Sequence, residues 1–356
     1  MGALLYILWS YIALLILAWV LLLFMAVEGI RRKAETMRAP EKPPRILLMV
    51  PCKGEDIGLE DNLRSAMRQD YGNYRAIAIV ESRSDGAMGA IRKAGIGYMV
   101  SGGFRCAKCS GKVRNLAAAI RRFGGYDAYC IMDSDVYAWE GWLSSLARAL
   151  GKNVGIATSF PIFEPVGGFW SRVKHVWGFV GIGLMENPAT RFGWGGSLLF
   201  RRELLTGNFR EFSESVSDDI PLTNFAKRRR MSIAYVPEAR PVVRCDDDRA
   251  RFFEWSTRQS AFAIRGNRRL LYYGLAFYGA NSLLIISAVP LAFYNPLFLA
   301  LLLPFAIGLA RTFRRSGRHA LWIIPAYAAT SFIYAYNLAI ASRTNRITWR
   351  GRHYDI

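Results

Sequence analysis

The sequence begins with a long uncharged stretch that ends in a basic cluster. Residues 3–27 carry no charged side chain and are long enough to cross a bilayer as one helix. No basic stretch precedes this segment and no small-residue cleavage site follows it, which favours a retained anchor over residues 1–30 rather than a removed signal peptide. Because Arg31, Arg32 and Lys33 follow, we expect the chain from about residue 30 onward to lie in the cytoplasm.

The pattern becomes apolar again near the C-terminus. Residues 270–310 are interrupted by Pro290 and by Asn295-Pro296, which predicts a helical hairpin. Residues 321–341 can form a last span, so we expect transmembrane helices over residues 270–341.

Two basic segments make it ambiguous on which side of the membrane the C-terminus lies. If the basic loop 311–319 is cytoplasmic and one span follows it, the basic tail 342–356 lies outside, against the preference of basic segments for the cytoplasm. Either the tail is an exception or one segment does not cross fully. The sequence leaves both arrangements open.

Residues 45–265 alternate between short apolar runs typical of strands and segments with helical spacing. We predict strands over residues 45–51, 74–80, 97–100 and 129–132, and helices over residues 60–69 and 113–123. This alternation predicts an α/β domain with a largely parallel sheet, whose ligands bind beyond the carboxyl ends of the strands. Six polar residues lie at the predicted strand ends: Lys53, Glu55, Glu81, Asp85, Asp133 and Asp135.

Two of these acids form an Asp-x-Asp turn. The apolar run 129–132 stops abruptly at Asp133 and Asp135, which is typical of a buried strand that delivers both carboxylates to its carboxyl end. Two carboxylates in one turn can share a hard divalent cation, and that cation can hold a diphosphate. The alternative is an ordinary surface turn.

Composition narrows the class of partner. The chain is 52% hydrophobic and has a formal net charge of +20. A basic excess suits nucleic acid, anionic lipid headgroups or phosphorylated substrates. Because the basic residues flank apolar segments and no zinc-finger or RNA-reading motif is present, the charge indicates a membrane surface and not a nucleic acid. Residues 169–185 have the pattern of an amphipathic segment lying on the membrane, with a buried core helix as the alternative.

The cysteines do not predict a metal site. Cys106 and Cys109 have CxxC spacing, but no second pair or nearby histidine completes a zinc site. For a cytoplasmic domain we expect the five cysteines to be mostly free thiols.

An ordered series of motifs runs along the chain: Pro51-Cys52-Lys53-Gly54-Glu55, Val80-Glu81-Ser82-Arg83-Ser84-Asp85, Gly111-Lys112-x-x-Asn115, Asp133-Ser134-Asp135, Gly195-Gly196-Ser197, Ser217-Asp218-Asp219 and the ending Ile347-Thr348-Trp349-Arg350-Gly351-Arg352-x-Tyr354. This series resembles family 2 glycosyltransferases with the GT-A fold, and within them the membrane-bound ceramide glucosyltransferase-like branch. The resemblance covers about residues 45–265 and the tail. An ordered set is much more specific than any single motif.

The resemblance implies a donor site for a nucleotide sugar. It places Pro51, Lys53 and Glu55 near the nucleotide, and either Glu81 or Asp85 on the uracil or ribose. Asp85 can equally be a turn residue, so this choice stays open. Lys112 is expected at the diphosphate and Asn115 in support of the loop. Asp133 and Asp135 are expected to bind Mg²⁺ or Mn²⁺.

The resemblance also implies an acceptor side. Family 2 enzymes invert the anomeric centre, which needs one general base, and the matching position is Asp219. Asp218 stands beside it, where Glu is common, and helix capping is the alternative task for both. Further acceptor-side candidates are Gly195, Gly196, Ser197, Arg251, Trp255 and Arg258. Glu254 stands where the family motif has arginine, and the aromatic residues here could instead form an interfacial belt.

Together these patterns predict a multi-pass enzyme of the cell membrane with a cytoplasmic catalytic domain. The expected reaction is inverting transfer of a sugar from a nucleotide sugar, with a leaning to UDP, to a membrane lipid. One alternative is a processive polysaccharide synthase, which predicts more spans and a complete Arg-Trp motif. The other is a non-catalytic membrane scaffold with a decayed transferase domain.

Overall fold

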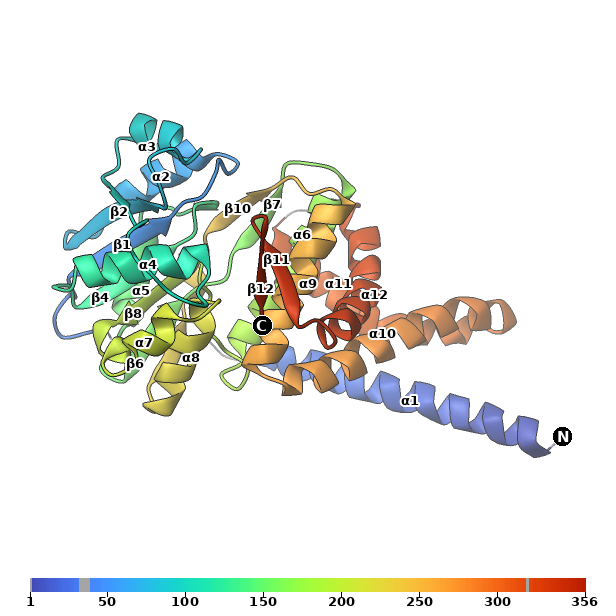
Figure 1. The fold of residues 1–356 in the computed structure, drawn as a ribbon. Coiled ribbons are helices and arrows are strands. Elements are labelled where there is room, and N and C mark those ends of the chain that lie inside the picture. Colours follow the sequence, from blue (N-terminus) through green and yellow to red (C-terminus); the bar gives the residue numbers. More distant parts are fainter. Residues whose placement is uncertain (1, 32–38, 318–319) are drawn as a thin grey trace. The chain divides into compact units, whose positions relative to one another are not determined.

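The computed structural model describes residues 2–31, 39–317 and 320–356 (Figure 1). The chain folds into two compact units. Unit 1 contains Met1–Ala34, Gly167–Phe179 and Asp247–Asp355, and unit 2 contains Glu35–Val166 and Val180–Asp246. Arg32, Lys33 and residues 318–319, which belong to two of the predicted basic segments, lie outside the described residues.

Within the described chain, unit 2 is built on a seven-stranded sheet with the order β3-β2-β1-β4-β8-β6-β9. The strands are β1 (Ile46–Pro51), β2 (Tyr74–Val80), β3 (Tyr98–Val100), β4 (Ala128–Met132), β6 (Val154–Thr158), β8 (Ser197–Arg201) and β9 (Ser232–Tyr235). The four strands predicted from the sequence are β1 to β4, and they are mutually parallel. The predicted α/β class with a parallel-rich sheet is therefore confirmed.

Strand β8 makes the sheet mixed. It runs antiparallel to β4, so that Ser197 at its start pairs with Met132 at the end of β4. This pairing brings the chain segment before β8 to the carboxyl end of β4, where the Asp-x-Asp turn lies. The sequence pattern did not predict this strand.

Helices cover the sheet of unit 2. They are α2 (Leu59–Met67), α3 (Met88–Ala94), α4 (Gly111–Arg122), α5 (Trp142–Ala149), α7 (Phe209–Ser213) and α8 (Asp219–Arg228), with short 3₁₀ turns at Arg202–Leu205 and Pro237–Ala239. Strands β1, β2, β4 and β8 share one core with α4, α7 and α8, and Leu116, Phe212 and Phe225 are fully buried in it. This shared core holds α4 and α8 against the sheet. A small sheet, β5-β10-β7, comprises β5 (Val136–Tyr137), β7 (Ile162–Pro165) and β10 (Val242–Cys245).

Unit 1 is mostly helical. It contains α1 (Gly2–Arg31), α9 (Arg249–Gly266), α10 (Arg269–Tyr294), the 3₁₀ helix η3 (Pro296–Leu302), α11 (Leu303–Ser316), α12 (Ile323–Ala341) and a hairpin of β11 (Arg346–Trp349) and β12 (Arg352–Asp355). Helix α6 (Phe169–Glu186) contributes its first part to unit 1 and its last part to unit 2. Helix α9 lies inside the predicted 45–265 domain but groups with unit 1.

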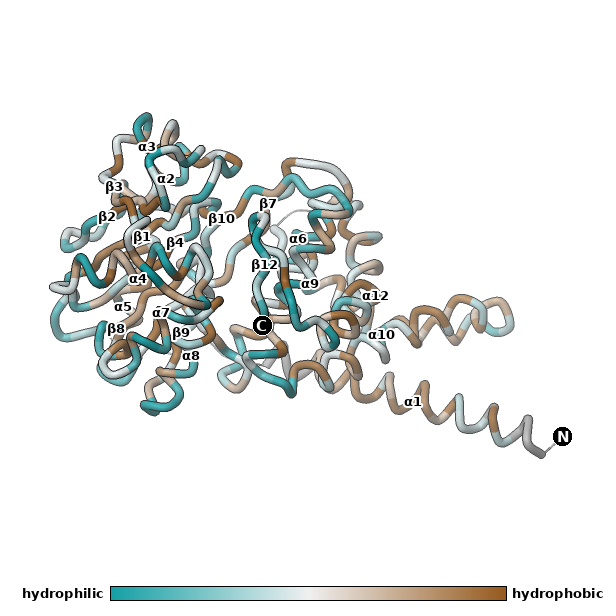
Figure 2. The backbone as a smooth tube through the Cα atoms, in the orientation of Figure 1, coloured by the Kyte–Doolittle hydropathy of each residue, from teal (hydrophilic) through white to brown (hydrophobic). Residues whose placement is uncertain are grey.

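Four segments in the described residues are long and apolar enough to cross a membrane. They are Trp9–Ala26, Arg269–Tyr294, Pro296–Ser316 and Ile323–Ala341. Figure 2 shows them as predominantly hydrophobic helices. They fall in the regions where the sequence predicted an anchor, a hairpin and a last span.

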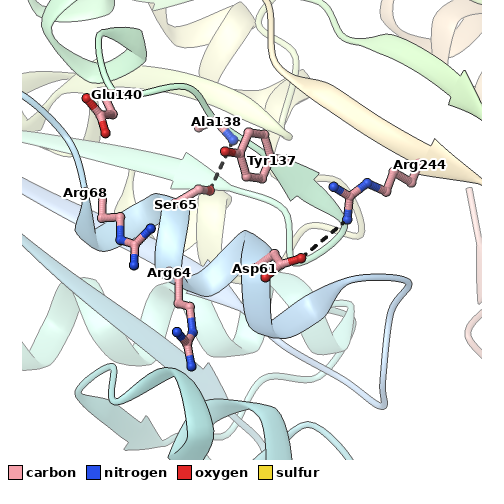
Figure 3. Close-up of a pocket in the computed structure, with 8 residues that line it drawn as sticks. All are labelled: Asp61, Arg64, Ser65, Arg68, Tyr137, Ala138, Glu140 and Arg244. Carbon is pink, nitrogen blue, oxygen red and sulfur yellow. Dashed lines mark hydrogen bonds and ion pairs between the residues drawn. The ribbon is translucent and has the colours of Figure 1, made fainter.

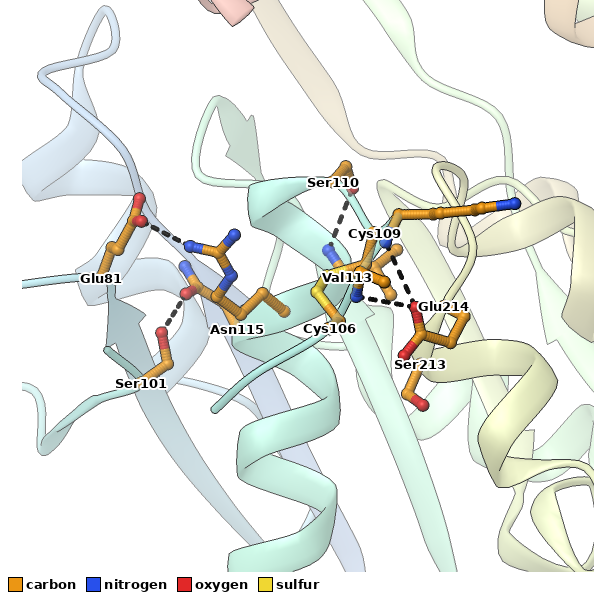
Figure 4. The surroundings of a disulfide bond; sticks show 12 residues. Glu81, Ser101, Cys106, Cys109, Ser110, Val113, Asn115, Ser213 and Glu214 are labelled. Carbon is orange, nitrogen blue, oxygen red and sulfur yellow. Dashed lines mark hydrogen bonds and ion pairs between the residues drawn. A yellow bond between two sulfur atoms is a disulfide. The ribbon is translucent and has the colours of Figure 1, made fainter. Parts of the chain in front are cut away.

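The prediction that the five cysteines are mostly free thiols holds for three of them and not for the pair Cys106 and Cys109. Cys106 and Cys109 form a disulfide, with their Cα atoms 5.8 Å apart (Figure 4). The prediction followed the expected compartment, whereas the loop before α4 brings the two side chains into bonding range. Cys52, Cys130 and Cys245 are free and buried, as expected.

Candidate active site

The predicted acids lie where parallel strands end. Asp133 directly follows β4, and its backbone N–H donates to Gly196 O at 3.4 Å. Asp133 and Asp135 are both partly exposed, while Ser134 between them is buried. The turn therefore presents two carboxylates at the carboxyl edge of the sheet, as the sequence predicted.

Lys112 links this turn to two distant segments. Its ammonium Nζ lies 2.7 Å from Asp133 Oδ1 and 3.0 Å from Asp218 Oδ1. Nζ also donates to Gly195 O at 3.1 Å. Lys112 occupies the first turn of α4, and Ser110 caps that helix by accepting from Val113 N at 3.2 Å. The cap thus fixes the position from which the lysine reaches the acids.

Charge is crowded in this cluster. Burial disfavours the charged form of Lys112, but the carboxylates around it, led by Asp133 and Asp218, hold its pKa above the ordinary value. Burial raises the pKa of Asp133 to about 7, with Asp135 and Asp218 acting in the same direction and Lys112 against it. The Asp133 side chain is still 31% exposed. Because the carboxylates outnumber the one lysine, the cluster can bind a further cation from solvent.

Asp219 is the second acid of the predicted Ser-Asp-Asp motif and opens α8. Its Oδ1 accepts a hydrogen bond from Ser217 Oγ, and its Oδ2 accepts from Gly195 N at 3.4 Å. Burial raises the pKa of Asp219, assisted by Asp218 and opposed by the Ser217 hydrogen bond. Helix capping falls to Ser217, whose Oγ accepts from Ile220 N at 3.2 Å. The two acids are therefore not needed as caps.

The glycine loop is packed too tightly for side chains. A Cβ on Gly195 would lie 2.3 Å from Asp218 Oδ2, and one on Gly196 would lie 2.2 Å from the Trp194 ring. Ser197 is fully buried, and its Oγ accepts from Trp142 Nε1 at 2.8 Å. The two glycines thus allow the close approach that the motif implied, while the serine side chain faces the domain interior.

The loop after β1 is fastened to the loop after β2. Asp85 Oδ1 accepts from Gly54 N at 2.8 Å and from Ala87 N at 3.0 Å. Asp85 therefore acts both as a turn residue and as a support for the loop after Pro51. Lys53 in this loop is partly exposed and Glu55 is exposed.

Glu81 and Asn115 take part in contacts between β2 and α4 (Figure 4). Glu81 Oε1 lies 2.6 Å from Arg114 NH1. Asn115 accepts a hydrogen bond from Ser101 Oγ and donates to Ile79 O at 3.2 Å. Asn115 thus ties α4 to the end of β2 and to Ser101.

Several supporting residues were not predicted from the sequence. Ser134 donates to Asp56 Oδ2 at 2.6 Å, and its carbonyl accepts from Asn62 Nδ2 at 2.9 Å. Arg114 pairs with Glu81, and Ser217 bonds Asp219. Asp56 directly follows the motif that ends at Glu55, and Arg114 fills an unspecified position inside the motif Gly111-Lys112-x-x-Asn115.

The α9 candidates belong to unit 1. Arg251 is 73% exposed, with Asp248 3.8 Å away. Trp255 packs against Trp177 at 4.8 Å between ring centroids. Arg258 donates to Thr348 O at 3.3 Å and stacks over the Trp349 ring.

A pocket of about 360 Å³ lies at α2, β5 and β10 (Figure 3). Arg244 and Asp61 face each other across it at 3.7 Å, and Ser65 Oγ accepts from Ala138 N at 3.1 Å. Its other lining residues are Arg64, Arg68, Tyr137 and Glu140. None of the predicted site residues lines it, so geometry and chemistry favour the strand-end cluster as the site.

The Asp-x-Asp turn suits a metal ion whose remaining ligands come from substrate and water. No group of three or more His, Cys, Asp or Glu side chains among the described residues is placed to hold a metal. Mg²⁺ usually takes one or two carboxylates and completes its shell with substrate phosphates and water, and Mn²⁺ also prefers such oxygen ligands. Asp133 and Asp135 fit a cation of this kind, bound together with a diphosphate.

The fold matches that of a solved sugar-transferring enzyme. The mannosyltransferase PcManGT from Pyrobaculum calidifontis, solved in complex with GDP-Man and Mn²⁺, aligns with a TM-score of 0.55 and 16% identity. The alignment covers 92% of this chain and 97% of that chain. The predicted GT-A fold is therefore confirmed.

The chain belongs to glycosyl transferase family 21, which matches residues 7–356. Over 167 residues it is 29% identical to the ceramide glucosyltransferase of Komagataella phaffii. This alignment covers 44% of the chain and 32% of that relative, so the match spans about a third of the relative's length. The predicted resemblance to ceramide glucosyltransferases is confirmed.

Proposed function

We propose that this glycosyltransferase moves a sugar from a nucleotide sugar, with UDP as the nucleotide, to a hydroxyl group of a membrane lipid, and that it inverts the anomeric centre. One observation carries the proposal. Asp133 at the end of β4 and Asp219 at the start of α8 belong to one cluster, joined by Lys112 and Gly195. An acid suited to the donor and an acid suited to the acceptor are thus held in the same site.

The donor lies against the carboxyl ends of β1, β2 and β4. Asp133 and Asp135 would hold Mg²⁺ or Mn²⁺, which neutralises charge on the departing nucleoside diphosphate when bound. Lys112 presents its ammonium to the same phosphates. The loop 51–55, fastened by Asp85, contacts the nucleotide, and PcManGT, which shares the fold, is a protein that binds GDP-Man and Mn²⁺.

Asp219 is the general base. Its carboxylate accepts the proton of the acceptor hydroxyl as that oxygen attacks the sugar, and the bond to the diphosphate breaks on the opposite face. A raised pKa makes Asp219 a stronger base than an exposed aspartate. Ser217 and the Gly195 N–H hold the carboxylate in one orientation. Asp218 keeps Lys112 in place, and Ser197 supports the loop.

The acceptor is a lipid with a free hydroxyl. The four apolar helices give the chain a means of remaining at the membrane, and the related enzyme is named for the lipid ceramide. Arg251 and Trp255 are the acceptor-side candidates on α9. Arg258 has a different task, because it holds the C-terminal hairpin.

A transfer assay tests this function. The purified full chain in lipid vesicles, with Mn²⁺, labelled nucleotide sugars and a panel of lipids that carry hydroxyl groups, should move label into the lipid fraction. Label in a growing polymer would favour the processive synthase. A complete lack of transfer over a broad donor and lipid panel would favour the scaffold.

A further inference from the structure

The last apolar helix is covered by protein more than the others. In α12, 44% of the candidate span is buried, against 17%, 28% and 11% for the spans in α1, α10 and Pro296–Ser316. Its buried residues include the polar side chains of Thr330, Ser331 and Asn337. Helix α12 therefore faces other helices rather than lipid along much of its length.

Helix α9 runs beside α12 in the same direction. Phe253 packs edge-on against Tyr336, with ring centroids 5.6 Å apart. Nearer the end of each helix, Thr257 Oγ1 lies 3.4 Å from Asn337 Oδ1. Just beyond α12, Thr344 O accepts a hydrogen bond from Arg265 at 3.3 Å. The two helices have 18 and 19 residues, so each is about 28 Å long.

Helix α9 is too charged to cross a bilayer. It carries Arg249, Arg251, Glu254, Arg258 and Arg265. The side chains of Arg251 and Glu254 are 73% and 52% exposed. Exposed charges in the middle of a spanning helix are strongly disfavoured. The last part of α12 follows α9 in parallel, and α12 also packs against the first half of α10, where Tyr334 stacks on Tyr278 with ring centroids 4.5 Å apart.

The start of α12 is also bound to a polar segment. Trp322, directly before α12, packs against His175 and lies under the Arg172 guanidinium of α6. Lys174 of α6 pairs with Asp247, just before α9, at 3.0 Å. Both ends of α12 are therefore attached to charged segments that are not among the candidate spans.

The other apolar helices are arranged differently. Tyr11 of α1 bonds Ser287 of α10 at 2.5 Å, and Trp19 donates to Ala300 O at 2.8 Å. Leu22 and Leu15 continue the same contact with α10. Helix α1 thus packs along α10 and η3 through apolar surfaces, which suits a group of spanning helices.

We propose that α12 does not cross the bilayer but lies at its surface beside α9. Helix α1, helix α10 and the segment Pro296–Ser316 then make three crossings. The C-terminal tail then remains on the same side of the bilayer as α9. Unit 2 is on this side as well, because the chain passes from Asp246 into α9 without a crossing. This inference concerns the membrane arrangement and goes beyond the proposed reaction.

The arrangement places the basic segments of unit 1 on one side. Exposed arginines lie at the C-terminal ends of α9 and α12 and in the segments that follow, and Arg265 donates a hydrogen bond to Asn345 at 3.0 Å. They are Arg265, Arg268, Arg269, Arg343, Arg346 and Arg350. A surface with this charge suits the anionic headgroups of one leaflet. The conflict between the basic loop and the basic tail disappears, because one apolar segment does not cross.

Thiol labelling of the full chain in sealed vesicles tests the proposal. Single cysteines are introduced at three exposed positions: Asp355→Cys in the tail, Asp70→Cys in unit 2, and Phe293→Cys at the far end of α10. Each variant is treated with a membrane-impermeant maleimide before and after the vesicles are opened. The unmodified chain gives the background from its own cysteines.

In vesicles where Asp70→Cys is labelled without opening, Asp355→Cys should be labelled equally and Phe293→Cys only after opening. Labelling of Asp355→Cys only after opening, together with Phe293→Cys, would overturn the proposal. Protease removal of an epitope placed after Ile356 gives a second readout that needs no substitution. Neither readout depends on sugar transfer, so the membrane arrangement and the proposed function can fail separately.

Discussion

Gly195 and Asp218 are so close that no side chain fits between them. A Cβ on Gly195 would lie 2.3 Å from Asp218 Oδ2. Asp218 in turn holds Lys112, and the backbone of Gly195 contacts both Lys112 and Asp219. The glycine is therefore the point at which the donor and acceptor halves of the proposed site meet.

Substituting this glycine should disrupt both halves. In Gly195→Ala the methyl group displaces Asp218 and with it the Lys112 ammonium, so we expect kcat to fall by roughly 100-fold, as for other small displacements of catalytic groups. Gly103→Ala is the matched control, because a Cβ there meets nothing within 4 Å. Equal activity of the two variants would show that the close contact has no catalytic role.

If Asp219 is the general base, its substitution should slow sugar transfer without weakening the binding of the nucleotide donor. Asp219→Asn keeps the shape of the side chain but cannot accept the proton, so transfer should fall about 10²- to 10⁴-fold. Binding of the nucleotide donor, measured by calorimetry, should change little. Asp70→Asn, an exposed acid in the same unit, should retain full transfer. Normal transfer by Asp219→Asn would remove this residue from the role of base.

The pKa of Asp219 predicts the acid limb of the pH profile. The base must be ionised, so kcat should decline as the pH falls through its pKa, which burial places above the ordinary aspartate value. The Ser217 hydrogen bond lowers this pKa. Ser217→Ala should therefore move the acid limb to higher pH, while Ser232→Ala, at an exposed serine, should not. A shift to lower pH, or none, would argue against Asp219 as the titrating group.

The Asp-x-Asp turn at Asp133 and Asp135 predicts that the affinity for the nucleotide donor depends on the metal ion. Asp135→Ala should lose most of the increase in nucleotide affinity that Mn²⁺ produces, because one of the two carboxylates for the cation is gone. Nucleotide titrations with and without Mn²⁺ measure this difference. An unchanged metal effect in the variant would exclude Asp135 as a ligand.

Local patterns were sufficient to predict the part of the sheet that forms the donor side. Residues 74–80 are an apolar run between turn residues, and they form β2 with the predicted bounds. The run before Asp133 likewise forms β4, buried along its whole length. In such segments the local pattern and the tertiary position agree.

The meeting of Gly195, Asp219 and Lys112 could not be predicted from local pattern. It depends on β8 inserting antiparallel beside β4, which pairs residues more than 60 positions apart in sequence. Only the resemblance to known transferases suggested that these residues share a site. The Cys106–Cys109 disulfide could not be predicted for a related reason, since it depends on the path of the loop before α4.

The anomeric configuration of the product tests the central claim most directly. Transfer from an α-linked nucleotide sugar to a lipid hydroxyl should give a β-linked glycolipid, identified by the NMR coupling constant of its anomeric proton, and the product should be absent with Asp219→Asn. An α-linked product, formed equally well by Asp219→Asn, would contradict inversion with Asp219 as the base.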